Sequence, residues 1–271
     1  MDIASIAGIV LAILGILSGM MIEGGSIAQI TQPTAALIVI GGTVGAVMLQ
    51  FPLSIFLDAC KSILKIFLPR PHDGEAILKQ LVDFAQKARK SGIVSLDSDL
   101  STVTDPFLMQ ALMLAVDGTE SSEVRKIMQL ELDNKSEIEE KIPAVFEAAG
   151  GYSPTVGIIG AVLGLIQVMK NLDNIDEVGR GIATAFVATI YGVALANLVF
   201  LPIAGKLKFR HREEVMLKEM MLEGVISILE GMNPRMMETK LRTFLFPPNT
   251  QKSNATKEAN PSPISATEAT T

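Results

Sequence analysis

The sequence of 271 residues predicts an all-α integral membrane protein, with four transmembrane helices and a helical cytoplasmic domain. Its composition is apolar, because 49% of the residues are hydrophobic and only 19% are charged. The charges are also unevenly spread. Asp, Glu, Lys and Arg are absent from residues 3–22, 24–57, 148–169 and 181–205. A helix of about 20 apolar residues crosses the hydrocarbon core of a bilayer, so each stretch is long enough to span it.

Several other classes of protein are excluded by the same composition. The single cysteine, Cys60, cannot form an internal disulfide, and no Cys/His spacing suggests a metal site. A net charge of −6 argues against nucleic acid as a partner. We find no phosphate-binding Gly-Lys loop and no nucleophile with a matching base, so we expect no cofactor, no catalytic residue and no enzymatic activity.

Basic residues at the ends of the spans predict the orientation of the chain. They follow the second and fourth spans, as Lys61, Lys65 and Arg70 and then Lys206, Lys208, Arg210 and Arg212. Because Lys and Arg are enriched on the cytoplasmic side, both exits face the cytoplasm. The two short loops between spans then face outward, and both termini lie inside.

The order of segments follows from these boundaries. The final residues are rich in Ser, Thr, Asn and Pro without apolar periodicity, which is typical of disorder. The predicted segments are a first span at 3–22, a second at 34–57, a cytoplasmic helical loop domain at 58–151, a third span at 152–171, a fourth at 182–205, a cytoplasmic helical segment at 206–248 and a disordered tail at 249–271.

The two large segments outside the spans have helical periodicity. Residues 75–90 predict an amphipathic helix that Gly92 ends. A long polar helix begins near residues 119–122, leads into the third span and carries an apolar stripe, as do residues 213–231. We therefore expect one compact domain built from two separated segments. The stripe of the long helix comprises Val124, Ile127, Met128, Ile138, Ile142, Val145 and Phe146.

Prolines and histidines near the span ends can be explained by helix geometry and solvation. Pro33 and Pro154 are expected at helix starts, where proline is favoured. Pro202 lies inside the fourth span, where it must kink the helix or free a carbonyl, as a hinge or for packing alone. His72 and His211 are expected in solvent or against lipid headgroups.

The predicted spans contain no ionisable residue that could relay ions. An ion path through lipid normally retains such a residue. Either the chain has no transport role, or the titrating group belongs to a second protein. Small residues spaced three and four apart in spans three and four, such as Gly157, Gly164 and Gly192, allow close helix approach. They fit packing within one subunit or around a shared oligomer axis.

Four segments resemble the MotA/PomA family, the stator subunits of the bacterial flagellar motor. They are MDIASIAGIVLAILGI at the start, ARKSGIVSLD at 88–97, GGYSPTVGIIGAVLGL at 150–165 and ATAFVATIYGVALANLVFLPIAGKL at 183–207. The resemblance covers about residues 1–245. It implies a pentamer in the bacterial inner membrane, around two copies of a single-span MotB/PomB-type partner. That partner would carry an intramembrane Asp and an anchor to peptidoglycan.

The resemblance also implies roles for particular residues. Ion flow would drive the ring around its partner, while the cytoplasmic domain pushes the rotor protein FliG. Arg89 and Lys90 match the basic rotor contact, and Asp97 matches an acidic position that is usually Glu. The implied coupling prolines are Pro154 and Pro202, and the residues matching the lining of the ion path are Thr189, Ala161 and Ala188.

The transported ion and the exact relative are separate questions. Sodium-driven relatives resemble one another in having threonines where this chain has Ala161 and Ala188, so we expect protons. An alternative is an ExbB/TolQ-like energy-transducing subunit, but those relatives usually have three spans and lack the hairpin of residues 3–57. A second alternative is a membrane scaffold without ion flux.

Overall fold

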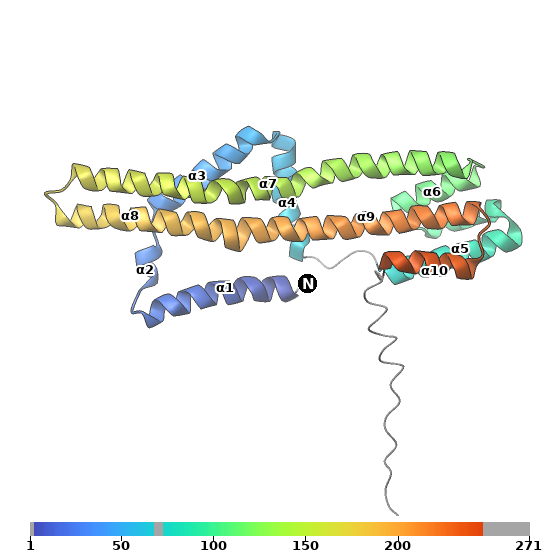
Figure 1. The fold of residues 1–271 in the computed structure, drawn as a ribbon, viewed down its shortest axis with the longest axis horizontal. Coiled ribbons are helices and arrows are strands. Elements are labelled where there is room, and N and C mark those ends of the chain that lie inside the picture. Colours follow the sequence, from blue (N-terminus) through green and yellow to red (C-terminus); the bar gives the residue numbers. More distant parts are fainter. Residues whose placement is uncertain (1–2, 68–72, 246–271) are drawn as a thin grey trace, which may run out of the picture. The chain divides into compact units, whose positions relative to one another are not determined.

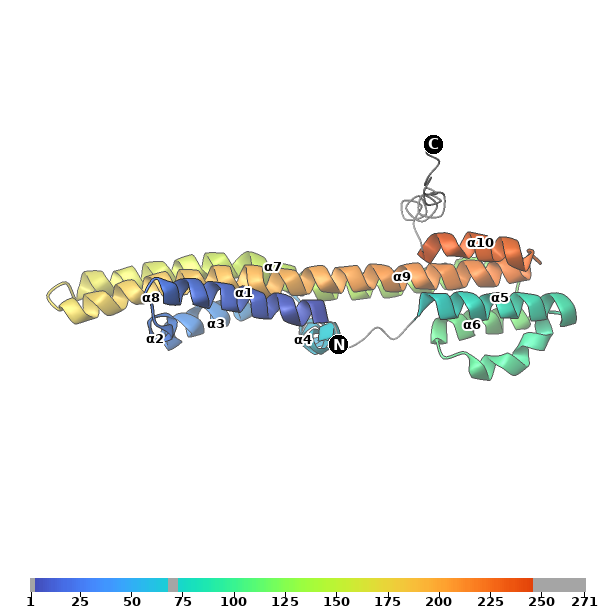
Figure 2. The ribbon, with the colours of Figure 1, turned by 90° about the horizontal axis from the view of Figure 1, so that it is seen from below.

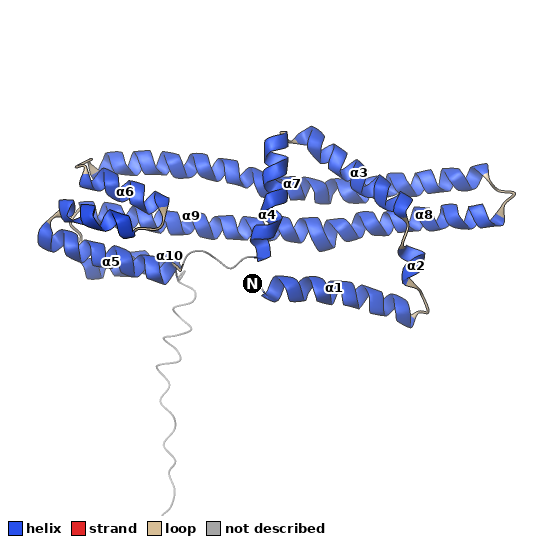
Figure 3. Ribbon diagram, turned by 180° about the vertical axis from the view of Figure 1, so that it is seen from behind, coloured by secondary structure: helices blue, strands red, loops and turns tan. Residues whose placement is uncertain are grey.

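The computed structural model describes residues 3–67 and 73–245. Within these ranges the chain is helical and has no strand (Figures 1 and 3). The predicted tail at 249–271 and His72 lie outside the described residues. The elements are α1 (Ile3–Ile22), α2 (Ile27–Ile30), α3 (Pro33–Gln50), α4 (Leu53–Phe67), α5 (Gly74–Ser91), the 3₁₀ helix η1 (Ile93–Thr102), α6 (Pro106–Val116), α7 (Ser121–Lys170), α8 (Ile175–Ala194), the π-helical segment η2 (Leu195–Phe200), α9 (Leu201–Leu229) and α10 (Pro234–Leu245).

The chain divides into two compact units. Unit 1 contains residues 1–70 and 134–212, and unit 2 contains residues 71–133 and those from 213 onward. Two of the three boundaries, 133/134 and 212/213, fall inside the long helices α7 and α9. The sequence-based segments of the helical domain, 58–151 and 206–248, extend beyond unit 2 along α7 and α9, because periodicity cannot show where one helix changes its packing neighbours.

The apolar helices of unit 1 agree with the sequence prediction in part. Helix α1 has the predicted bounds of the first span, and Pro33 is the first residue of α3. Inside the predicted second span at 34–57, helix α3 stops at Gln50 and α4 begins at Leu53. Pro52 disfavours helical geometry at Phe51, whose φ of −118° and ψ of 145° are extended.

Three helices of the described chain are long and apolar enough to cross a membrane. They are α3, α7 and the continuous run Ile175–Leu229, while Ile6–Ile22 is a shorter apolar helix. Helix α7 alone has 50 residues and contains all of the predicted third span at 152–171 except its last residue. The run from Ile175 contains the predicted fourth span.

In unit 2, helices α5, α6, α9 and α10 lie side by side (Figure 2). Together with η1 and the start of α7 they share a hydrophobic core. The predicted amphipathic helix at 75–90 buries its apolar residues: Ile77, Leu78, Leu81, Phe84 and Ala85 are buried, and Ala88 is partly buried. Side chains from the two separated segments meet in this core, and its fully buried members include Leu81, Leu112, Met128, Met220, Ile226 and Leu241.

The predicted apolar stripe of the long helix is wrong at two positions. Ile127 is 43% exposed and Ile138 is 62% exposed. In unit 2 the buried face of α7 instead runs through Val124, Met128 and Leu132, which are four residues apart and lie on one side of the helix. Neighbouring residues of a helix point about 100° apart, so Ile127 turns away from the core.

Candidate functional site

Three charged side chains lie at the end of α5 and in the following 3₁₀ helix of unit 2. Arg89 and Lys90 occupy the last turn of α5, and Asp97 lies in η1. All three are exposed. Among the described residues none of the three has an ion-pair partner. These charges are therefore available to a second molecule.

The backbone around these charges is fixed by local sequence. Asp73 caps the start of α5 by accepting from the Glu75 N–H, and Gly92 ends the helix with φ of 81°. A positive φ is easily adopted only by glycine, so Gly92 sets the reversal into η1. Leu96 is 1% exposed and anchors η1 in the core. The reversal at Gly92 and the buried Leu96 side chain therefore hold η1 next to the end of α5.

In unit 1, α7 and α8 are in close backbone contact. A Cβ atom on Gly164 would lie 2.8 Å from the carbonyl oxygen of Gly181, and one on Gly157 would lie 2.9 Å from that of Ala188. The small residues thus pack within one chain, which agrees with the first of the two sequence-based interpretations. Such contacts bring helices close enough for dispersion forces to act along the whole interface.

Pro154 lies inside α7 and not at a helix start as the sequence predicted. Its ring leaves the carbonyl of Gly150 without the usual N–H donor. A Cβ on Gly192 would lie 3.2 Å from the Pro154 Cα atom, so α8 packs directly against this turn. The predicted helix start was wrong because it was placed where the charge-free stretch begins. Helix α7 instead continues from the polar sequence into the apolar sequence without a break.

Pro202 follows a π-helical segment in unit 1. Over Leu195–Phe200 the helix widens, and the N–H of Leu201 bonds to the Ala196 carbonyl, five residues earlier. Proline has no N–H and its ring crowds the carbonyl four residues back, so a widened turn accommodates it. The sequence correctly indicated a perturbed helix here, but it did not specify the widened turn.

The three residues matched to an ion path have different surroundings. Thr189 is partly buried, and its hydroxyl donates to the Ala185 carbonyl at 3.1 Å. Ala188 is fully buried, and its Cβ lies 2.8 Å from the Cβ position of Gly160. Ala161 is only partly buried. Within this single chain, Ala188 faces α7 in the tight helix interface.

Comparison with known proteins supports a specific family. Residues 6–92 match the model for the N-terminal part of motility protein A, and residues 99–220 match the MotA/TolQ/ExbB proton channel family. Motility protein A of Bacillus subtilis is 37% identical over 246 residues, covering 90% of this chain and 91% of its own. This chain belongs to the motility protein A family.

Two solved structures share this MotA-family fold. The C. jejuni MotAB structure aligns with a TM-score of 0.87 and 32% identity, over 92% of this chain and 97% of that one. The flagellar MotAB stator complex from Bacillus subtilis gives a TM-score of 0.84 and 35% identity, over 94% and 98%. Nearly the whole length of this chain is therefore accounted for by the family fold.

The MotA-family models cover most of the candidate residues. The N-terminal match includes Arg89 and Lys90, and the channel match includes Pro154, Thr189 and Pro202. Asp97 falls between the two matched ranges. Among the residues that the structure describes, no group of three His, Cys, Asp or Glu side chains is placed to hold a metal ion.

One polar cluster of this MotA-family chain differs from the sequence prediction. His211 is only 10% exposed and is not solvated. In unit 1 its Nδ1 atom lies 3.1 Å from the Glu139 carboxylate, and its Nε2 atom lies 2.9 Å from the Ser136 hydroxyl. The cluster joins α7 to α9. Helical spacing on α7 places Ser136 and Glu139 on one face, which was the available signal, but the sequence could not show that this face meets α9.

Proposed function

We propose that this chain is a stator subunit of the bacterial flagellar motor and forms an ion channel with a MotB-type partner. The proposal rests chiefly on its match to the MotAB stator complex over 94% of the chain with a TM-score of 0.84. The match at residues 6–92 to the N-terminal part of motility protein A favours this function over an ExbB/TolQ-like role or a passive scaffold.

The proposed topology has four spans in the inner membrane. Helix α1, helix α3, the apolar part of α7 after residue 147 and the run from 181 to 205 would each cross the bilayer. The basic residues that follow the second and fourth apolar runs support cytoplasmic termini and a cytoplasmic unit 2. The other predicted segment boundaries are part of this proposal, and the second span would end with α3 at Gln50.

The scarcity of charged residues in the spans indicates which subunit carries the ion. The proposed spans have no Asp, Glu, Lys, Arg or His apart from Lys170 at the end of the third, so the group that carries the ion belongs to the partner. We propose five copies of this chain around two single-span partners, each with an intramembrane Asp. One charge crossing 100 mV releases about 2.3 kcal/mol, so a full rotation requires many ions.

The proposed contact with the rotor protein FliG is the charged end of α5 with η1. Arg89, Lys90 and Asp97 are exposed and have no ion-pair partner among the described residues, which leaves their charges free to attract complementary charges. Pro154 and Pro202 would couple ion passage to movement, because both interrupt the hydrogen bonding of long helices.

A charge reversal on α5 tests the rotor contact. We expect Arg89→Glu to abolish most motility and FliG binding, while the variant still copurifies with its partner. Lys79→Glu is the matched control, because Lys79 is exposed on the same helix but lies more than two turns before Arg89. Normal swimming of Arg89→Glu at low expression, over several salt concentrations, would remove this assignment.

We propose that protons are the coupling ion. Ala161 and Ala188 supply no oxygen ligand for a hard cation such as sodium, and they would lie beside the path that includes Thr189. A proton needs only a titrating carboxylate and a chain of water. Swimming speed should therefore be independent of external sodium at constant pH, and a steep sodium dependence would contradict the proposal.

A further inference from the structure

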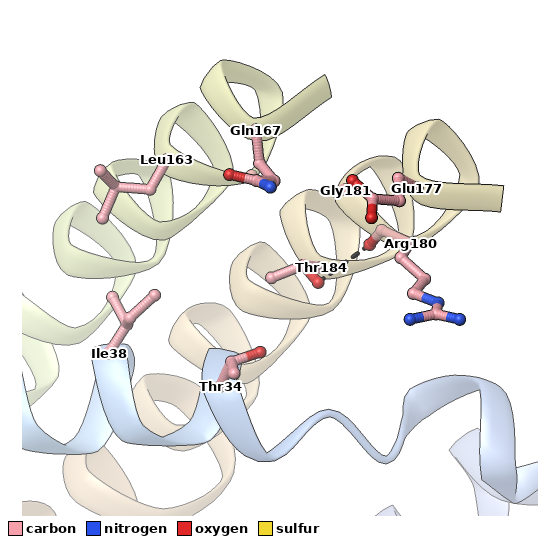
Figure 4. A pocket seen from close by; sticks show the side chains of 9 residues that line it. Thr34, Ile38, Leu163, Gln167, Glu177, Arg180, Gly181 and Thr184 are labelled. Carbon is pink, nitrogen blue, oxygen red and sulfur yellow. Dashed lines mark hydrogen bonds between the residues drawn. The ribbon is translucent and has the colours of Figure 1, made fainter. Parts of the chain in front are cut away.

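A pocket of about 350 Å³ lies where α3, α7 and α8 meet in unit 1 (Figure 4). It is close to the hairpin between α7, which ends at Lys170, and α8, which begins at Ile175. Under the proposed topology this hairpin faces outward. The pocket therefore lies at the outer border of the hydrocarbon layer, and none of the residues implied in ion flow or rotor contact lines it.

The wall of the pocket has polar and apolar sides. The amide of Gln167 and the carboxylate of Glu177 lie on neighbouring helices and face the same space, whereas the Thr184 hydroxyl donates to the Arg180 carbonyl of its own helix at 2.9 Å (Figure 4). Ile38 and Leu163 supply the apolar side, and Leu163 is 47% exposed. An amphipathic ligand would be complementary to this arrangement.

The side chains of the two charged residues of the pocket point in different directions and form no ion pair with each other. Glu177 and Arg180 are three residues apart on α8, but no ion pair links them and neither has another ionic partner within the described chain. The Arg180 guanidinium extends away from Gln167, toward the rim (Figure 4). The pocket thus presents a negative group inside and a positive group at its edge.

We propose that this pocket binds the head group of a phosphoethanolamine lipid. The lipid ammonium would bond to the Glu177 carboxylate and the Gln167 amide oxygen, and the phosphate would lie on the Arg180 guanidinium. The acyl chains would follow the apolar surface that begins at Ile38 and Leu163. The planar guanidinium is well suited to phosphate, because it donates two parallel hydrogen bonds.

The position of these charges along α8 favours a lipid over a soluble ion. Arg180 directly precedes the charge-free run 181–205, so its guanidinium would lie at the depth of lipid phosphates. A free phosphate would use Arg180 and be repelled by Glu177. A choline head group has no N–H donor for Glu177, and a glycerol head group has no positive charge. The proposal rests on the proposed membrane topology but is independent of torque generation.

The test measures lipid retention by the purified complex of this chain with its MotB-type partner. Native mass spectrometry would count bound lipids during titration with phosphatidylethanolamine, phosphatidylcholine and phosphatidylglycerol of identical acyl chains. We expect the ethanolamine lipid to bind about tenfold more tightly than the choline lipid, as a hydrogen bond between charged groups implies. Soluble phosphoethanolamine serves as the probe for a ligand without acyl chains.

Two variants separate the contributions of the charges. Glu177→Gln should remove the preference for ethanolamine over choline, and Arg180→Gln should weaken binding of both lipids by about tenfold. Asp176→Asn is the matched control, because Asp176 is exposed in the first turn of α8 and does not line the pocket. It should behave as the unmodified protein.

Three outcomes would overturn the proposal. The first is equal retention of the three lipids by the unmodified complex, as expected if a neighbouring subunit fills the pocket. The second is an unchanged preference for ethanolamine over choline in Glu177→Gln. The third is binding of soluble phosphoethanolamine as tight as that of the ethanolamine lipid. None of them bears on motility. Conversely, normal swimming of Arg89→Glu would overturn the rotor assignment and leave lipid selectivity unchanged, so the two failures are distinguishable.

Discussion

The Lys87 Nζ atom lies 2.6 Å from the Asp99 carboxylate and joins the last turns of α5 to η1. The same ammonium group donates to the Ser98 hydroxyl at 3.1 Å. Because Lys87 lies two residues before Arg89 and Asp99 lies two residues after Asp97, this ion pair links the two segments that carry the charges assigned to the rotor contact. Its own charges are neutralised internally, whereas those of Arg89 and Asp97 remain free.

Removing this ion pair should weaken rotor binding with little loss of stability. The side chains of Lys87 and Asp99 are 38% and 28% exposed, so solvent screens the pair and its loss should cost less than about 1 kcal/mol. We expect Lys87→Met and Asp99→Asn each to reduce FliG affinity severalfold. The double variant should lose no more than either single variant, as titration of FliG in a double-mutant cycle would measure.

The control for this cycle is an exposed ion pair elsewhere in unit 2. Lys126 pairs with Glu123 within α7 at 2.6 Å, with side chains 71% and 51% exposed. Lys126→Met should leave FliG affinity unchanged. Additive effects of Lys87→Met and Asp99→Asn would mean that the two residues contact the rotor separately and do not position its binding charges.

Replacing Pro202 should change the widened turn before it. In Pro202→Ala the restored N–H can bond four residues back, so we expect residues 195–206 to become a regular α-helix with slower amide hydrogen exchange. If the widened turn is part of the coupling movement, torque in a tethered-bead assay should fall while membrane insertion is preserved. Pro234→Ala is the control, because Pro234 begins α10 and requires no such adjustment.

Slower exchange combined with normal torque would show that the π-helical segment serves packing alone. Unchanged exchange would show that the widened turn is set by neighbouring side chains and not by the ring of Pro202.

Helix α5 and the break in α3 show how far sequence reasoning reaches. The buried face of α5 was predictable because its apolar residues repeat with the helical period, and Gly92 marked its end. The end of α3 was missed because the absence of charge continues past Pro52, and a hydropathy pattern does not register a lost N–H donor. Composition identifies an apolar stretch more reliably than it identifies the helix within it.

The exposure of the proposed rotor-contact residues was predictable from the sequence, but the contacts between distant helices were not. Arg89, Lys90 and Asp97 are local in sequence, and their exposure follows from the polarity of the helix end. By contrast, the contacts of His211 with Ser136 and Glu139 span more than 70 residues of sequence. Such contacts depend on how α7 and α9 pair, which periodicity alone does not determine. The pocket beside Glu177 also requires three helices to meet.

Glu223 should make unit 2 less stable in acid. Burial raises the pKa of its carboxyl group, but hydrogen bonds from Arg125 and Lys240, together with their charges, outweigh burial and lower the pKa. A carboxyl group whose pKa is lowered on folding stabilises the fold above its unfolded pKa, and this contribution is lost as pH falls through the folded pKa. The contacts join α9 to α7 and α10.

We therefore expect Glu223→Gln to destabilise the docking of α10 by about 1–2 kcal/mol at pH 7. The difference from the unmodified protein should shrink as pH falls through the lowered folded pKa of Glu223, where its carboxyl group becomes protonated. Hydrogen-exchange protection of the α10 amides, corrected for intrinsic exchange at each pH, would measure this difference in stability. Glu238→Gln is the control, because Glu238 and Arg242 form a half-exposed pair within α10. A difference that persists unchanged in acid would contradict the assigned role of charge.

Two glycines near the α7–α8 hairpin should respond oppositely to the same substitution. A Cβ on Gly164 would lie 2.8 Å from the Gly181 carbonyl oxygen and 2.9 Å from the Ala185 nitrogen, so backbone would have to move. We expect Gly164→Ala to cost about 1–3 kcal/mol, as overpacking of an interior does. Gly179 has open space around its Cβ position, and Gly179→Ala should gain up to about 1 kcal/mol from helix propensity. Thermal unfolding of the detergent-solubilised complex would compare them. Equal melting temperatures would show that α7 and α8 can separate at no cost, which the close backbone contact between them contradicts.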